Sequence, residues 1–288
     1  MVIKVFLSIF SCLMFIASPV VAMDGAPGSD ALQRINVAGK QRMLSQRIAR
    51  AACFDAIGVA EDRHLEMRLA AMVEFDRARQ ALRLGDESFG LVKETVPEVL
   101  DLFDALDAEW PGFHRITDLG ADHVWTSEDF ATLLAQARKI LSVSNQAVSV
   151  LETEYVDQLD VPELTRLVNV AGRQRMLTQK ATLEFCLVVS GLGAAGVADD
   201  LRATVVLFDR SLAGLRVGND DLGLIGAPSV EIEYQLELVA ELWAPVRAVL
   251  LSGADGSDVS GEDLVELVGA IDVVLREANE AVTLYEQF

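Results

Sequence analysis

The sequence has 288 residues and is strongly acidic, with 44 Asp and Glu residues against 24 Lys and Arg residues and a formal net charge of -20. This balance argues against a general nucleic-acid-binding protein, because a phosphate backbone requires a basic surface. Hydrophobic residues make up 51% of the chain but aromatic residues only 6%, a composition that indicates a globular and largely helical protein.

Residues 1–22 have the three regions of a secretory signal peptide: a lysine near the start, a short apolar run, and small residues before a cleavage point after Ala22. The alternative is an uncleaved membrane anchor, which the shortness of the apolar run disfavours. We therefore expect a protein exported to the periplasm, with a mature chain that begins at Met23. Its two cysteines, Cys53 and Cys186, would then lie in a compartment where disulfides form.

The rest of the chain is an internal repeat. Residues 36–47 and 169–180 are identical at nine of twelve positions, and the other three positions exchange similar residues. The same offset aligns Cys53 with Cys186 and Trp110 with Trp243, and an offset longer by a single position aligns Asn145 with Asn279. Such a duplication indicates two copies of one structural unit, which we place at residues 23–160 and 161–288.

Each unit is expected to form four helices. In the first unit the predicted boundaries are Gly58 at the end of the first helix, residues 60–84 for the second, Pro97 near the start of the third, and Ser127 at the start of the fourth. Glycine is favoured just after a helix and proline in its first turn. With no alternating strand pattern, the sequence predicts an all-α protein of two antiparallel four-helix bundles related by a pseudo-twofold axis.

The first helix of each unit, here called a motif helix, is basic within an otherwise acidic protein. Residues 31–52 contain five basic residues and residues 164–183 contain four, and neither segment has an acidic residue. At about 3.6 residues per turn, one stripe of each helix carries a glycine, an arginine, a glutamine and a cysteine. These residues are Gly39, Arg42, Gln46 and Cys53 in the first unit and Gly172, Arg175, Gln179 and Cys186 in the second.

Two features of this stripe indicate an anion site. A glycine inside a helix costs about 1 kcal/mol relative to alanine, so Gly39 and Gly172 favour close approach of another backbone or of a ligand. Two guanidinium groups that converge in a partly dry site repel each other unless an anion lies between them. We therefore predict that Arg42 and Arg175 bind a small oxyanion, with the two glutamines beside them. The alternatives are glycines that only record the duplication, and arginines that extend into solvent or pair with carboxylates.

The cysteines provide a geometric test of this arrangement. Cys53 lies eleven residues after Arg42, close to three helical turns, so the two side chains share a face. If the motif helices pack side by side and parallel, with Arg42 next to Arg175, Cys53 must also approach Cys186. Antiparallel packing would separate the two cysteines. We therefore predict a disulfide between them, with two buried free thiols as the alternative.

Residues 35–47, Ile-Asn-Val-Ala-Gly-Lys-Gln-Arg-Met-Leu-Ser-Gln-Arg, closely resemble the start of the periplasmic domain of type IV pili methyl-accepting chemotaxis transducers, the PilJ-type domain. Their Ala-Gly-x-x-Arg-Met core is also similar to the nitrate-contacting segment of nitrate/nitrite sensor kinases. The resemblance implies a four-helix bundle whose homodimer brings two first helices together, so that one arginine from each clamps a single nitrate. By motif position these arginines are Arg42 and Arg175, with Gly39 and Gly172 allowing the close approach. The tandem chain then resembles such a dimer made covalent.

The sequence does not favour an enzyme, a metal site or a cofactor. None of the three histidines is repeated in the second unit, and no serine or cysteine nucleophile has a recognisable base partner. Glu61 and His64 have the spacing of a di-iron ligand pair, but the second unit has Ala194 and Val197 at these positions.

Two non-enzymatic functions remain. The first is a periplasmic sensor that binds a small oxyanion between the motif helices and signals through a membrane receptor or kinase. Nitrate and nitrite are the leading candidates for this ligand. The second is a ligand-free periplasmic interaction or scaffold protein associated with a chemoreceptor or a type IV pilus system. The acid-free arginine segments favour the first function. Because the sequence has no recognisable output module, both functions require a partner.

Overall fold

A computed structural model of the chain describes residues 27–119, 123–158 and 163–288. The expected signal peptide, residues 1–22, and the expected boundary between the two units at residue 160 lie outside the described residues.

Eight α-helices and three short 3₁₀ helices make up the described part of the chain, which contains no strand. The helices of the first unit are α1 (Pro27–Ala56), α2 (Glu61–Leu84), α3 (Pro97–Thr117) and α4 (Ser127–Glu154). Those of the second unit are α5 (Glu163–Val189), α6 (Val197–Val217), α7 (Val230–Ala254) and α8 (Gly261–Gln287). The 3₁₀ helices are η1 (Glu87–Phe89), η2 (Val156–Gln158) and η3 (Asp220–Leu222). The predicted all-α fold is confirmed.

The same local signals position the helices in both units. Glycines with positive φ follow α2 and α6, at Gly85 (φ 79°) and Gly218 (φ 90°), where a residue with a side chain would be strained. A capping box precedes each fourth helix: Thr126 caps α4 and Ser260 caps α8, each together with an aspartate three residues later. These four helix ends are therefore encoded in the residues beside them, which is why their positions can be predicted from sequence.

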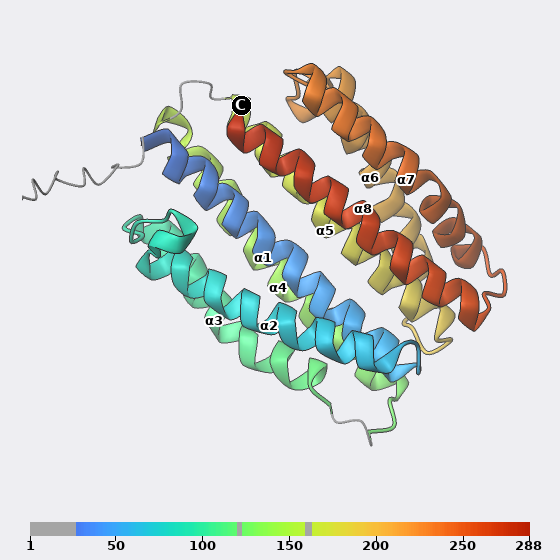
Figure 1. Ribbon diagram of the computed structural model, residues 1–288. Helices are drawn as coiled ribbons and strands as arrows, with labels where there is room; N and C mark the ends of the chain where they lie inside the picture. Colours follow the sequence, from blue (N-terminus) through green and yellow to red (C-terminus); the bar gives the residue numbers. More distant parts are fainter. Residues whose placement is uncertain (1–26, 120–122, 159–162) are drawn as a thin grey trace, which may run out of the picture.

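Within each unit the first helix packs against the second and the fourth, and the third packs against the fourth (Figure 1). A pair of stacked aromatic rings repeats in the two cores, Phe75 on Trp110 at 4.3 Å and Phe208 on Trp243 at 4.0 Å between ring centroids. The two units meet along α1 and α5, with additional contacts between α4 and α5 and between α1 and α8. The motif helices therefore lie at the centre of the molecule.

This central position explains the burial of polar residues on the motif helices. Of the 27 residues of α5, 21 are buried, polar and charged side chains included. The helix is therefore covered on nearly every side, and its polar side chains are buried together with its apolar ones. The polar stripe that would face solvent in one isolated bundle is covered here by the other bundle.

Candidate functional site

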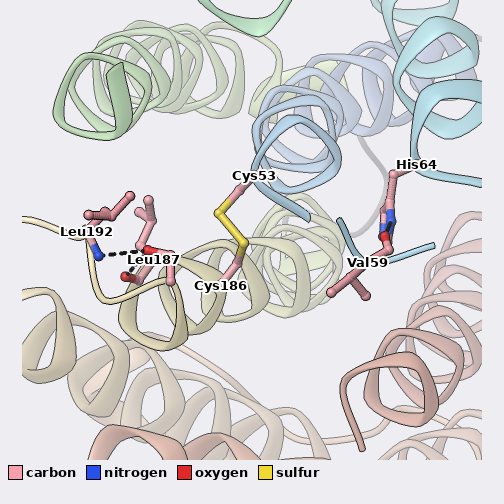
Figure 2. The surroundings of a disulfide bond; sticks show 7 residues. Cys53, Val59, His64, Cys186, Leu187 and Leu192 are labelled. Carbon is pink, nitrogen blue, oxygen red and sulfur yellow. Dashed lines mark hydrogen bonds between the residues drawn. A yellow bond between two sulfur atoms is a disulfide. The ribbon is translucent and has the colours of Figure 1, made fainter. Parts of the chain in front are cut away.

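The two motif helices, α1 and α5, run side by side and parallel. Near their ends Cys53 and Cys186 form a disulfide with Cα atoms 6.3 Å apart, and neither cysteine is exposed (Figure 2). Equivalent residues also meet nearer the start of both helices, where Gly39 and Gly172 lie. The predicted disulfide is therefore confirmed, and the alternative of two free thiols is not what the structure shows.

The two glycines make room for the two arginine side chains. A Cβ atom on Gly39 would lie 3.1 Å from Arg42 Nη2 and 3.7 Å from Arg175 Nη2. The reciprocal distances at Gly172 are 3.2 Å to Arg175 Nη2 and 3.7 Å to Arg42 Nη2. Both Nη2 atoms therefore lie within 3.7 Å of one point beside each glycine. The structure thus places Arg42, Arg175, Gly39 and Gly172 in one cluster at the interface between the units.

Each arginine donates hydrogen bonds to its own unit's fourth helix and to the opposite unit's motif helix. Arg42 donates from Nη1 to Asn145 Oδ1 at 3.4 Å and from Nη2 to the carbonyl oxygen of Asn169 at 3.3 Å. Arg175 donates from Nη1 to Asn279 Oδ1 at 3.0 Å and from Nη2 to Asn36 Oδ1 at 2.6 Å. The cluster therefore joins α1, α4, α5 and α8, and the pseudo-twofold axis relates its two halves.

A glutamate flanks the cluster on each side, again in equivalent positions. Asn169 donates from Nδ2 to Glu152 Oε2 at 2.6 Å, and Asn36 hydrogen bonds to the carboxylate of Glu286. The alignment that pairs Asn145 with Asn279 also pairs these two glutamates. Both are partly buried, Glu152 on α4 and Glu286 on α8. We refer below to the two arginines, these four asparagines and these two glutamates as the arginine cluster.

The electrostatics of the cluster favour an additional negative charge. Burial lowers the pKa of Arg42 to about 9, with a further contribution from the charges of Arg173 and Arg175, and burial lowers the pKa of Arg175 to about 10. Both guanidinium groups remain protonated at neutral pH. Among the described residues no carboxylate forms an ion pair with either within 4.0 Å, and the buried Nε atoms of both lack an acceptor. Two positive charges and two free donors are thus held in a nearly dry site.

The predicted glutamines form no hydrogen bond with the arginines in the described part of the chain and donate to other groups instead. Gln46 donates from Nε2 to the carbonyl oxygen of Ala137 in α4 at 3.1 Å, and Gln179 donates from Nε2 to Thr178 Oγ1 at 3.1 Å. Both amides are therefore used within their own units, although they lie on the predicted stripe. A residue one turn further along a helix shares its face but can still turn its side chain towards another neighbour.

Two other arginines of α1 form ion pairs with carboxylates. Arg34 pairs with Asp30 and Glu94 at 3.1 and 3.0 Å, and the buried Arg50 pairs with Asp272 of α8 at 3.0 Å. Asp30 belongs to α1 itself, Glu94 lies in the loop before α3, and Asp272 comes from α8. An acid-free segment in a motif helix therefore does not leave all of its arginines without partners.

Sequence reasoning missed the asparagines and glutamates of the arginine cluster. Asn145 and Asn279 stood out in the repeat, but their distance from the motif in sequence concealed their contact with the arginines. The alignment of these two asparagines could have identified Glu152 and Glu286 as well, because it pairs glutamate with glutamate at those positions.

The described residues contain no group of three His, Cys, Asp or Glu side chains that could hold a metal ion. The Nδ1 atom of His64 hydrogen bonds to the carbonyl oxygen of Val59 at 2.6 Å (Figure 2). The ring of His64 also stacks on Phe54. Nor does any described helix have the length and apolar character needed to span a bilayer.

Two curated proteins of Pseudomonas aeruginosa are similar to this chain. The first is Methyl-accepting chemotaxis protein McpN, with 41% identity over 85 residues, which cover 29% of this chain and 15% of McpN. The second is Protein PilJ, with 29% identity over 217 residues, which cover 73% of this chain and 30% of PilJ. The chain therefore spans less than a third of the length of either relative.

The sequence model of the PilJ family, described as Type IV pili methyl-accepting chemotaxis transducer N-term, matches the chain twice, at residues 29–140 and 163–261. Each match begins near the start of a motif helix and covers most of one structural unit. The chain therefore belongs to the PilJ family of chemotaxis-transducer N-terminal domains, and it carries two copies of the family's domain in tandem.

Proposed function

We propose that the chain is a periplasmic sensor protein that binds one small oxyanion between Arg42 and Arg175 and passes its occupied state to a membrane receptor or kinase. Family membership supports a sensor or interaction role. The buried disulfide supports an oxidising compartment such as the periplasm. The choice of ligand rests on the chemistry of the arginine cluster.

The observation that carries the proposal is the pair of buried, protonated guanidinium groups with no carboxylate in direct contact among the described residues. An isolated buried charge is unfavourable, and a pair of like charges is more so. An anion between them would accept charge-assisted hydrogen bonds from both arginines. It would also offer acceptors to the Nε atoms, which have none in the part of the chain that the structure describes.

The geometry favours a small, planar anion. A hydrogen bond from a guanidinium to an oxyanion is about 2.8 Å long. Since both Nη2 atoms lie within 3.7 Å of one point beside each glycine, one compact anion can reach both of them. A planar ion also matches the planar guanidinium groups, which bind oxyanions through paired donors. Nitrate and nitrite are therefore the first ligands to test, as the resemblance of the Ala-Gly-x-x-Arg-Met segment also suggests.

The test is isothermal titration calorimetry of the protein with nitrate, nitrite, chloride and sulfate. We expect selective binding of nitrate or nitrite, and we expect Arg42→Gln and Arg175→Gln each to abolish it without loss of helical content by circular dichroism. Arg115→Gln is the matched control, because Arg115 is an exposed residue of α3, a helix that contributes no residue to the arginine cluster. Equal, weak responses to all four anions, or unchanged affinity in both cluster variants, would contradict the proposal.

The alternative is a ligand-free interaction protein associated with a chemoreceptor or a type IV pilus system. One observation favours it: Glu152 and Glu286 already offset part of the positive charge, since their fields raise the pKa values of Arg42 and Arg175 respectively against the effect of burial. A cluster balanced in this way could serve only to hold the two units together. The anion titration distinguishes the two functions.

A further inference from the structure

Glu152 and Glu286 flank the arginine pair on its two sides, yet neither closes an ion pair with it. Each glutamate instead accepts a hydrogen bond from an asparagine of the opposite unit's motif helix. Asn36 connects Glu286 directly to Arg175, because its Oδ1 atom accepts from Arg175 Nη2 while its side chain also bonds the carboxylate. The negative charges are therefore held one residue away from the guanidinium groups.

The surroundings of Glu286 show that its charge is incompletely compensated. The groups that act on it are Asn36 and Lys40 from α1 and Arg175 from α5. Lys40 is itself paired with Glu74, so its charge is shared between two carboxylates. The Oε1 atom of Glu286 is buried and has no hydrogen-bond donor among the described residues.

Glu152 has a similar place on the other side of the pseudo-twofold axis. Among the described residues, the groups that interact with it are Asn169, Arg166 and Arg173 of α5 and Arg42 of α1, which are all basic or amide side chains. Arg166 lies 3.5 Å from its Oε1 atom but is more than a third exposed, so water screens that pair. Both sides of the arginine cluster therefore carry one glutamate in the field of the buried arginine.

We propose that Glu152 and Glu286 act as the built-in counter-ions of the arginine pair, so that an incoming oxyanion binds in competition with their negative charge. This inference rests on the proposed function, because it concerns the affinity of the same site. The glutamates keep two buried guanidinium groups together when no anion is bound. The glutamates also weaken anion binding, and they thereby set the anion concentration at which the site becomes occupied.

A dependence on pH follows from this arrangement. Burial raises the pKa of Glu286 above the usual glutamate value, although Asn36, Arg175 and Lys40 oppose the shift. A bound anion adds negative charge beside the carboxyl group and raises its pKa further. Anion binding therefore takes up protons, and by linkage the affinity increases as the pH falls from neutral towards the pKa of Glu286.

The experiment is a nitrate titration by calorimetry at pH 7.5 of the wild-type protein, Glu152→Gln, Glu286→Gln and the double variant. Glutamine removes the charge but keeps an oxygen that can accept the hydrogen bond from asparagine. We expect each single variant to bind nitrate about tenfold more tightly, the order of magnitude expected of one nearby charge in a partly buried site. Glu266→Gln should leave the affinity unchanged, because Glu266 is exposed on α8 and forms no ion pair with another described residue.

The same titrations at pH 5.5 and 6.5, in buffers of different ionisation enthalpy, measure the proton uptake. We expect proton uptake in the wild-type protein and its loss in the double variant. Because the double variant keeps all three histidines, any proton uptake by histidine occurs in both proteins and cancels in the comparison. Nitrate binding that is unchanged or weaker in the glutamine variants would overturn the inference, since the glutamates would then only orient the asparagines. If neither the wild-type protein nor the double variant binds any anion, the proposed function itself fails. Binding by the double variant alone would support both proposals.

Discussion

The disulfide between Cys53 and Cys186 should contribute a large share of the stability of this protein. Its cysteines are 133 positions apart, so it closes a long loop between equivalent positions of the two repeats. In the chain-entropy treatment, a loop of this length lowers the entropy of the unfolded state enough to stabilise the folded state by about 5 kcal/mol. With a urea dependence of roughly 2 to 3 kcal/mol per molar, its loss should move the unfolding midpoint down by about 2 M.

The measurement compares oxidised and reduced protein that begins at Met23, so that the remaining cysteines are these two. Both cysteines are fully buried, so the protein must be unfolded, reduced and refolded in the presence of a reductant. Urea unfolding followed by far-ultraviolet circular dichroism then gives the two midpoints. The reduced wild-type protein is a better comparison than an alanine variant, because it removes the cross-link and keeps both sulfur atoms in the core.

Two results would refute this reasoning. Two reactive thiols in the denatured but unreduced protein would show that the bridge is absent. Equal midpoints of the oxidised and reduced forms would show that the bridge does not restrict the unfolded chain, as would happen if the two repeats stayed associated in urea. A Cys53→Ala, Cys186→Ala variant should unfold at a midpoint at or below that of the reduced protein, because it also loses buried sulfur atoms.

Three further predictions concern single residues. Gly39→Ala should abolish nitrate binding in calorimetry, because its Cβ would lie 3.1 Å from the guanidinium group of Arg42. The control is Gly269→Ala, because Gly269 in α8 has open space around it. This control should still bind nitrate, and it should stabilise the protein by about 0.5–1 kcal/mol in urea unfolding. Gly253→Ala should destabilise it by about 1–3 kcal/mol in the same assay, since the new Cβ would overlap the buried ring of Phe185. Burial alone would raise the pKa of Asp272, but the arginine charges around it lower the pKa below the usual aspartate value. Its contribution to stability is therefore present above about pH 4 and lost as the pH falls further, so the stability measured by unfolding between pH 5 and 2 should depend less steeply on pH in Asp272→Asn.

Much of the fold could be predicted because its signals are local and occur twice. The ends of α2 and the starts of α3 and α4 follow from a glycine with positive φ, a proline in the first turn and a capping box, all of which act within a few residues. The repeat allowed each signal to be checked against its second copy. Because Arg42 and Cys53 share one face, a disulfide between Cys53 and Cys186 was predicted only for motif helices that pack in parallel, and the structure contains this disulfide.

The partners of the side chains could not be predicted in the same way. Gln46 lies on the same stripe as Arg42 but donates to the carbonyl oxygen of Ala137. Arg50, which belongs to the acid-free segment 31–52, pairs with Asp272 from the other unit. A stripe gives the direction of a Cβ atom, whereas a long side chain chooses among neighbours that only the packing brings near.

By itself, the sequence determined the duplication and the helical fold, because helical periodicity and equivalence between repeats are properties of the chain alone. It predicted the pairing of the cysteines and the approach of Arg42 to Arg175, but it left two free thiols and separate arginines as alternatives. Only the tertiary structure decided that the arginines are surrounded by asparagines from four helices, with Glu152 and Glu286 one residue further out. These contacts join residues separated by up to 139 positions in the chain. The charge balance of the site depends on such distances between helices, and no local pattern specifies them.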